Sequence, residues 1–148
     1  MLFDLVIIAC GQRKIWAANP RLGPVEARKA YVGGYFLQNR AFAQRRGKRW
    51  LILSAKYGLL DPNTKIEDYD VTFKRAGGNP IQPERVREQV LTGQPIRIHD
   101  GWKVAVLGGR EYQAVARHAL SELSIVLKCA SRAYLAERGV WSLPAGLP

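Results

Sequence analysis

The sequence is poor in cysteine and histidine. Its two cysteines, Cys10 and Cys129, are too few for the disulfide framework of a small secreted domain, so we expect a reducing, cytoplasmic location. The two histidines, His99 and His118, form no zinc-binding spacing with these cysteines. The sequence therefore predicts no metal site and no cofactor.

Long hydrophobic runs are also missing. The longest apolar run is Leu5 to Ala9, whereas a membrane-spanning helix needs roughly 20 apolar residues. A strand pattern begins almost at the first residue, so we expect no signal peptide before it. The sequence thus predicts a cytoplasmic protein with no membrane partner.

Acidic residues are scarce beside basic ones. The sequence has 12 Asp and Glu residues and 23 Lys and Arg residues, which gives a formal net charge of +11 over 148 residues. Such an excess favours nucleic acid, phosphorylated ligands or anionic surfaces as partners and says little about the fold. The alternative is a compositional bias of an Arg-rich genome that serves solubility. We expect nucleic acid, with DNA preferred over RNA, or a nucleotide as the partner of a monomeric protein.

What the sequence does contain is an alternation of strand and helix patterns across one domain, residues 1–148. Continuous apolar runs with β-branched residues predict strands that are buried on both faces. This alternation predicts an α/β fold, a three-layer α/β/α sandwich around a mainly parallel sheet of about four strands. The expected strands are Phe3–Ala9, Trp50–Ser54, Trp102–Leu107 and Ser124–Leu127, and the expected helices are Pro24–Arg46 with a break at Gly33-Gly34, Glu84–Leu91 and Glu111–Leu123.

Three of the expected strands end in unusual residues. The segments that follow them are Cys10–Lys14, Ser54–Gly58 and Gly108–Tyr112. In a parallel sheet, the carboxyl ends of the strands meet at one edge, and ligands bind outside that edge. We therefore expect these segments to converge on one site.

The third of these segments has the features of an anion site. Gly108 and Gly109 allow a ligand to approach the backbone closely, and the N–H groups of the following helix favour an anion. Arg110 can add a bidentate contact to a phosphate. Glu111 is a candidate carboxylate, although at a helix N-terminus it also complements the helix dipole. The alternative is a tight turn from strand to helix, with Tyr112 on the inner side of that helix.

The second segment combines a serine, a lysine and a tyrosine. Ser54, Lys56 and Tyr57 can hold a phosphate, orient a base edge or stack on a ring. The Ser-x-Lys spacing also suits a serine that is activated by a lysine amine. The alternative is that Lys56 is solvated and that Tyr57 covers the core.

Two further residues are candidates for chemistry. Cys10 lies at the end of the first strand with Arg13 and Lys14 nearby, and cationic neighbours favour a nucleophilic thiolate. The alternative is a small core residue, which is the interpretation we give to Cys129. Asp70 belongs to a dense carboxylate group and can act as a general base or stabilise a cationic transition state. The alternative is an acidic loop that pairs with nearby lysines.

Several of these stretches occur together in a known group of proteins. They are Cys10-x-x-x-Lys14, Ala30-Tyr31-x-Gly33 leading to Phe36, Leu53-Ser54-Ala55-Lys56-Tyr57-Gly58-Leu59-Leu60, Tyr69-Asp70 and Gly108-Gly109-Arg110-Glu111-Tyr112. Over residues 3 to 125, the chain resembles a family of small bacterial and phage domains of unknown function. It is more distantly similar to the Cys-Ser and Lys-Pro-Tyr motif domain of archaeosine synthases and, at the level of the fold, to the uracil-DNA glycosylase superfamily.

The resemblance implies nucleic-acid base chemistry rather than one reaction. Cys10 and Lys14 match the spacing of the archaeosine synthase cysteine and lysine, but Gly11 replaces the serine. Ile15-Trp16 follows Lys14, so the lysine-proline-tyrosine motif is absent. The Gly-Gln-Asp-Pro pattern of uracil-DNA glycosylases is absent as well, and fold-level analogy alone does not assign a reaction.

These observations predict an enzyme that cleaves or exchanges an N-glycosidic bond of a modified or damaged base. Tyr31 or Tyr57 would stack on the base, while Ser54 and Lys56 hold it and Asp70 assists the chemistry. Two alternatives remain, a nucleic-acid-binding module without chemistry and an enzyme acting on free nucleotides or nucleosides. The predicted catalytic residues are Asp70, Lys56, Ser54 and Cys10, and the predicted substrate-binding residues are Lys14, Tyr31, Tyr57, Gly108, Gly109, Arg110, Glu111 and Tyr112.

Overall fold

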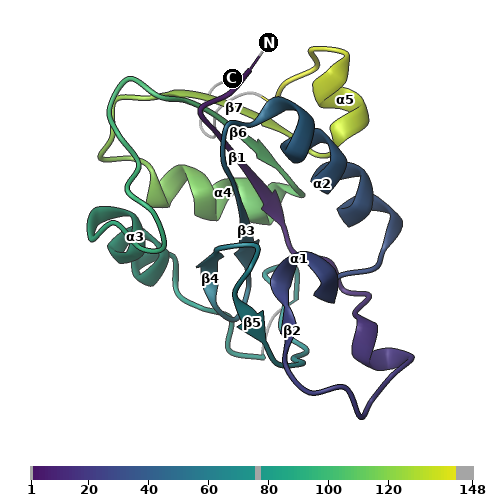
Figure 1. Cartoon of the computed structure of the whole chain (residues 1–148). Coiled ribbons are helices and arrows are strands. Elements are labelled where there is room, and N and C mark those ends of the chain that lie inside the picture. The colour runs from purple at the N-terminus through teal and green to yellow at the C-terminus, as the bar shows by residue number, and fades with distance from the viewer. Residues whose placement is uncertain (1, 76–77, 143–148) are drawn as a thin grey trace.

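A five-stranded sheet forms the centre of the fold. The computed structural model describes residues 2–75 and 78–142, and the strands follow the order β4-β3-β1-β6-β7 (Figure 1). Four of these strands run parallel, and β4 runs antiparallel beside β3. The strands are β1 (Leu5–Ala9), β3 (Trp50–Ser54), β4 (Gly58–Leu60), β6 (Lys103–Leu107) and β7 (Val126–Ala130).

The order in which the chain adds strands to the sheet reverses between β1 and β6. From β1 the chain crosses to β3 on one side, and from β6 it crosses to β7 on the other side. The register pairs Ala9 of β1 with Leu53 of β3, and Ile8 of β1 with Leu107 of β6. The carboxyl ends of the central strands therefore lie side by side. In open α/β sheets, such a switch point is where ligands bind.

Helices cover both faces of the sheet. On one face, α2 (Gly34–Arg46) and α5 (Ala133–Glu137) pack over Val6 and Ile8 of β1, while on the other face α3 (Pro83–Leu91) and α4 (Arg110–Ala119) pack over Leu5 and Ile7 (Figure 1). Because β1 is buried on both faces, its sequence is apolar at every position rather than alternating. The α/β class and the mainly parallel sheet are confirmed.

A smaller unit lies beside the carboxyl ends of the strands. It contains the short helices η1 (Ile15–Ala17) and α1 (Ala27–Ala30), and an antiparallel pair of strands, β2 (Val25–Glu26) and β5 (Lys65–Ile66). This pair ties the segment after β1 to the segment after β4. As a result, the chain before α1 and the long loop after β4 pack against each other near the switch point.

Several elements differ from the sequence prediction. The first expected helix begins at Ala27 rather than Pro24, because Val25–Glu26 pairs as strand β2, and the last expected helix ends at Ala119 rather than Leu123. The last strand of the sheet is Val126–Ala130 rather than Ser124–Leu127, and it carries Lys128, which is tolerated because β7 lies at the edge of the sheet. The strand β4 was not expected at all. The reversal from β3 into β4 depends on Gly58, whose φ of +75° favours glycine. An ideal Cβ at this position would lie 2.2 Å from Oε1 of Gln89.

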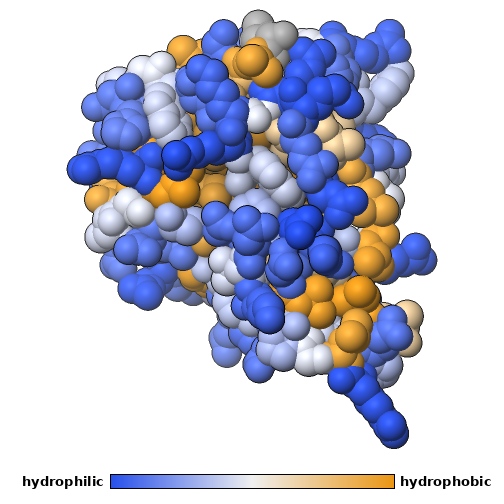
Figure 2. All heavy atoms as spheres, in the orientation of Figure 1, coloured by the Kyte–Doolittle hydropathy of each residue, from blue (hydrophilic) through white to orange (hydrophobic). Residues whose placement is uncertain are grey.

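The face of the molecule that is seen in Figure 1 is largely hydrophilic. Figure 2 shows blue hydrophilic residues over most of the face seen in Figure 1, with hydrophobic residues gathered in smaller patches. Within residues 2–75 and 78–142, no helix combines the length and the apolar character needed to cross a membrane.

Candidate functional site

A cavity of about 370 Å³ opens at the switch point between β1 and β6. Its lining comes from the end of β1 and the loop that follows it, from the first turns of α2, from the segment after β5 and from the turn between β6 and α4. Ser131, which follows β7, completes the lining. The lining residues are Ala9, Cys10, Gly11, Gln12, Arg13, Gly33, Gly34, Tyr35, Phe36, Asn39, Thr72, Lys74, Gly108, Gly109, Tyr112 and Ser131.

Glycines make this cavity possible. An ideal Cβ on Gly108 would lie 2.6 Å from Cβ of Ala9, so only glycine lets the ends of β1 and β6 approach this closely. Gly109 is the N-cap of α4, and Gly33 is the N-cap of α2. Neither cap has a side-chain hydrogen bond to the helix it precedes. Two helix N-termini therefore border one cavity, and the first N–H groups of each helix favour a negative charge there.

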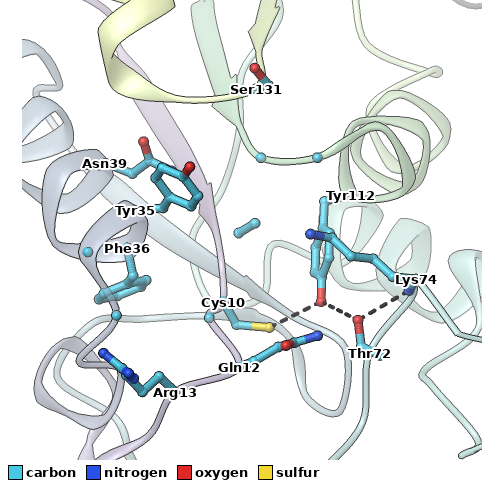
Figure 3. A pocket seen from close by; sticks show the side chains of 16 residues that line it. Cys10, Gln12, Arg13, Tyr35, Phe36, Asn39, Thr72, Lys74, Tyr112 and Ser131 are labelled. Atoms are coloured by element: carbon cyan, nitrogen blue, oxygen red, sulfur yellow. Dashed lines mark hydrogen bonds between the residues drawn. The ribbon is translucent and has the colours of Figure 1, made fainter.

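Cys10 lies between the two sides of the cavity, opposite the aromatic side chains of α2 (Figure 3). Its Sγ is 3.5 Å from the hydroxyl oxygen of Tyr112, which in turn is 3.4 Å from Oγ1 of Thr72. The Thr72 hydroxyl also accepts a hydrogen bond from the backbone N–H of Lys74 at 3.1 Å. Burial raises the pKa of Tyr112 well above its usual value, and the neighbouring Cys10 raises it further. The Tyr112 hydroxyl therefore stays protonated and remains available as a donor.

Two cationic side chains stand at the edge of the cavity. Arg13 and Lys74 are both exposed and both belong to the lining. Both face glycines of the lining: an ideal Cβ at Gly33 would lie 3.6 Å from Cβ of Arg13, and one at Gly109 would lie 3.3 Å from Cε of Lys74. Each cation thus stands next to one of the two helix N-termini, and both pairs attract an anion.

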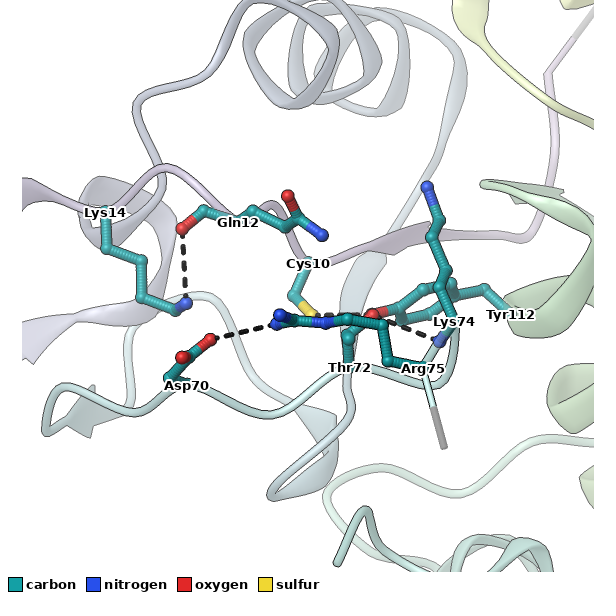
Figure 4. A network of polar contacts seen from close by, with 8 residues as sticks. All are labelled: Cys10, Gln12, Lys14, Asp70, Thr72, Lys74, Arg75 and Tyr112. Carbon is teal, nitrogen blue, oxygen red and sulfur yellow. Dashed lines mark hydrogen bonds and ion pairs between the residues drawn. The ribbon is translucent and has the colours of Figure 1, made fainter. Parts of the chain in front are cut away.

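A second, smaller hollow of about 310 Å³ adjoins the cavity and shares Gln12 with it. Lys14 is buried there, with its Nζ 4.4 Å from the ring centroid of Tyr69 and 3.4 Å from the carbonyl oxygen of Gln12. Asp70 lies in the same hollow, but its side chain is 91% exposed and is paired with Arg75 at 3.2 Å (Figure 4). Lys14 and Asp70 are therefore neighbours of the cavity rather than part of its lining.

Ser54 makes hydrogen bonds that hold the turn after β3. Its Oγ accepts the backbone N–H groups of Lys56 and Tyr57, each at 3.1 Å, and its hydroxyl donates to Tyr69 at 2.9 Å. The hydroxyls of Tyr69 and Tyr31 are 2.6 Å apart. Ser54 and Tyr31 are fully buried, so neither a nucleophilic serine nor a stacking Tyr31 has access to a ligand in this structure.

The remaining predicted residues lie outside the cavity lining. Lys56 is exposed, with its Nζ 5.2 Å from the ring centroid of Tyr57. Tyr57 is half-buried and packs edge-on against Tyr69, with 5.6 Å between the ring centroids. Arg110 and Glu111 are exposed on the first turn of α4. Of the twelve predicted site residues, the cavity brings together Cys10, Gly108, Gly109 and Tyr112.

Several lining residues were not predicted from the sequence. Tyr35 and Asn39 belong to α2, and the Gly33-Gly34 pair before this helix mirrors Gly108-Gly109 before α4. That repeated pattern was the available signal. Thr72 and Lys74 lie in the middle of the loop after β5, away from any strand end or helix start, so nothing in their spacing points to the site.

No metal site is evident in the part of the chain that the structure describes. Among those residues, no group of three or more His, Cys, Asp or Glu side chains is arranged to hold an ion. The described lining of the cavity likewise carries no carboxylate. Its donor set, which is made of N–H groups, cations, hydroxyls, amides and a thiol, suits an anionic organic ligand.

Comparison with known proteins gives two findings. Residues 5–133 match a family of unknown function, DUF6884. The chain is also 33% identical over 119 residues to the uncharacterized protein YfjM of Bacillus subtilis (strain 168), and the match covers 80% of this chain and 77% of that protein. The matched family range contains the whole cavity lining.

Proposed function

The chain belongs to DUF6884, a family of unknown function, and we propose that it is a base-directed enzyme that holds one nucleotide of a nucleic acid in the β1–β6 cavity. We propose further that it acts on the N-glycosidic bond of that nucleotide. One observation carries this proposal. The switch-point cavity brings a cysteine thiol together with two helix N-termini and two exposed cations.

The phosphate of the nucleotide would lie against the glycine-rich walls. The helix N-termini at Gly33 and Gly109 supply backbone N–H groups, and Arg13 and Lys74 supply positive charge. The net charge of +11 would attract the polymer from a distance before this contact forms. The volume of the cavity is within the range of small-molecule sites and suits one nucleotide rather than a duplex. A target base within a duplex would therefore have to be flipped out.

The reacting bond would lie near Cys10 and Tyr112. In hydrolysis, the bond from C1′ to the base nitrogen breaks, a hydroxyl from water bonds to C1′, and the remaining proton passes to the base. The protonated Tyr112 hydroxyl can stabilise the leaving base by donating a hydrogen bond. In an exchange reaction, the Cys10 sulfur would bond to C1′ as the bond to the first base breaks, and the thiol proton would pass to that base. An incoming base would then bond to C1′ as the carbon–sulfur bond breaks, and its proton would return to the thiol. Asp70, which is exposed and paired with Arg75, would contribute to the reaction only through its negative charge near the cavity.

The finer fold assignment is part of the same proposal. A likeness to the uracil-DNA glycosylase superfamily is supported by a mainly parallel sheet with its cavity at the carboxyl ends of the strands. We also propose that DNA is the preferred polymer and that the protein acts as a monomer.

One observation favours a second candidate, a nucleic-acid-binding module without chemistry. Hydrolysis of N-glycosidic bonds usually relies on a carboxylate, and none of the described lining residues carries one. Such a module would bind through Arg13, Lys74 and the helix N-termini and would release no base.

A matched pair of double variants tests the proposal. R13Q/K74Q removes the two cavity cations, whereas K29Q/R97Q removes two exposed cations outside the cavity lining. We expect R13Q/K74Q to weaken the binding of single-stranded DNA at least tenfold and to reduce the salt dependence of binding by about 1.4 in log–log slope. K29Q/R97Q is expected to have the smaller effect. Equal losses in both variants would contradict binding in the cavity.

The chemistry is tested separately with oligonucleotides that carry modified or damaged bases. We expect the wild type to release base, the C10S and Y112F variants to release at least tenfold less, and both variants to keep their affinity for DNA. Binding without release by the wild type across single strands, duplexes and free nucleotides would favour the module without chemistry.

A further inference from the structure

Tyr35 is an open aromatic ring at the cavity. It lies in the first turn of α2, lines the cavity and is 64% exposed. Its hydroxyl accepts a hydrogen bond from Nη1 of Arg132 at 3.2 Å, and Cζ of the same guanidinium lies 5.1 Å from the ring centroid. Arg132 follows the cavity residue Ser131. The pair therefore joins α2 to the segment after β7, next to the cavity.

The other aromatic rings of the lining are covered. Phe36 and Tyr112 are both buried, with exposed fractions of 3% and 4%. Figure 3 shows Tyr35 projecting from α2 on one side of the cavity, with Tyr112 on the opposite side and Cys10 between them. Among the described lining residues, Tyr35 is thus the aromatic side chain with a free surface for a ligand.

Exposure alone does not make a tyrosine a binding residue, because isolated exposed aromatics are common. Tyr134 illustrates this within the same chain. It is 57% exposed, its hydroxyl accepts a hydrogen bond from Nη1 of Arg138 at 2.6 Å, and Cζ of Arg138 lies 5.4 Å from its ring. Tyr134 does not line the cavity. What distinguishes Tyr35 is its position, and Tyr134 provides a matched control.

We propose that Tyr35 is a stacking platform for an unpaired nucleobase next to the nucleotide held in the cavity. This inference rests on the proposed function. The guanidinium of Arg132 lies over one face of the ring and donates a hydrogen bond to its hydroxyl, so a base would stack on the opposite face. A ring that already makes these contacts would lose less side-chain entropy when the base binds. A base in a duplex already stacks on its neighbours, whereas a base in a single strand gains a new contact here. The platform would therefore select single-stranded or locally opened nucleic acid.

The test compares two fluorescein-labelled strands that carry the same phosphates. One is a ten-nucleotide thymidine strand, and the other is a ten-unit strand of abasic tetrahydrofuran sites. Fluorescence anisotropy measures their affinity for the wild type and for the Y35A, Y35F, Y35W and Y134A variants. We expect Y35A to bind the thymidine strand about 5- to 150-fold more weakly and the abasic strand unchanged. Y35F and Y35W should keep the affinity of the wild type, and Y134A should behave as the wild type does.

Four outcomes would overturn the inference, and they differ in what they leave standing. If Y35A binds the thymidine strand as tightly as the wild type while R13Q/K74Q binds it weakly, the cavity binds phosphate and the platform is wrong. If Y35A weakens both strands equally, or if Y134A matches Y35A, base stacking on Tyr35 is likewise wrong. If the wild type binds neither strand, the proposed function fails and the platform fails with it.

Discussion

The Sγ of Cys10 lies 3.5 Å from the hydroxyl oxygen of Tyr112, although 102 positions separate the two residues in the sequence. The sheet explains this contact. The pairing of Ile8 with Leu107 brings the ends of β1 and β6 together, and Tyr112 follows in the first turn of α4. A nucleophilic side chain and a protonated phenol thus meet at the switch point of the sheet, where the chain can hold a ligand.

The two cysteines should differ sharply in reactivity. Cys10 is half-buried and lines the cavity, whereas Cys129 is fully buried and burial raises the pKa of its thiol. We expect Ellman's reagent to modify one thiol of the native protein quickly, and both thiols after unfolding in guanidinium. C10S should lose the fast reaction and C129S should keep it. A fast reaction that persists in C10S would contradict the exposure of Cys10 in the cavity.

Gly108 should be intolerant of a side chain. In G108A the added methyl group would lie 2.6 Å from Cβ of Ala9, so β1 and β6 would have to shift apart. We expect a loss of about 1–3 kcal/mol in the free energy of unfolding, measured by urea denaturation. G34A is the matched control, because nothing lies within 4 Å of a Cβ at Gly34 and helix formation favours alanine. Equal stabilities of the two variants would contradict the close approach of β1 and β6.

Ser54 should stabilise the fold rather than take part in the chemistry. In S54A the backbone N–H groups of Lys56 and Tyr57 lose their acceptor, and the hydroxyl of Tyr69 loses one of its two partners and keeps Tyr31. We expect a loss of about 1–3 kcal/mol in the free energy of unfolding. DNA binding and base release per folded molecule should be unchanged at low temperature. A folded S54A that binds DNA normally but releases no base would instead assign Ser54 to the reaction.

Stability should fall in alkaline solution because of three buried tyrosines. Burial raises the pKa of Tyr31, Tyr69 and Tyr112, and Cys10 raises each of them further. Their hydroxyls ionise near pH 10 in the unfolded chain and stay protonated in the folded one. The stabilisation is therefore complete below pH 10. Above it, the unfolded state loses more protons, and stability declines by about 1.4 kcal/mol per pH unit for each tyrosine.

This decline can be followed by absorbance at 295 nm and far-ultraviolet circular dichroism in one pH titration. Tyrosinate absorbance from these three residues should appear only as the helical signal is lost. Y69F should reduce the tyrosinate absorbance that appears together with unfolding. Full ionisation of every tyrosine in a protein that is still folded would contradict their burial.

The main features of the fold could be predicted from the sequence because they depend on local patterns. The apolar runs at β1, β3 and β6 and the glycine break before α2 are strong signals, and the structure confirms them. The strand β4 could not be predicted in this way. Its three residues follow a turn that depends on Gly58 and on Gln89 from α3, which is a contact between distant parts of the chain.

The candidate site was predictable only where it follows strands. Cys10, Gly108 and Gly109 come directly after β1 and β6, so topology alone brings them together. Lys74 reaches the cavity from a loop, and packing against the rest of the fold sets the path of that loop. No periodic pattern in the sequence indicates such a path. Conversely, the residues Ser54 to Tyr57 also lie at the end of a strand, yet the Ser54 hydroxyl and the backbone N–H groups of Lys56 and Tyr57 hold the turn into β4.

Protection of Cys10 from alkylation tests whether nucleic acid occupies the β1–β6 cavity. The C129S variant would be treated with iodoacetamide, with and without a saturating ten-nucleotide thymidine strand, and the modified fraction followed by mass spectrometry. If the nucleotide lies beside Cys10, the strand will slow alkylation at least tenfold, and this protection will be lost in C129S/R13Q/K74Q at the same strand concentration. An unchanged alkylation rate while the strand is fully bound would show that nucleic acid binds elsewhere on the protein.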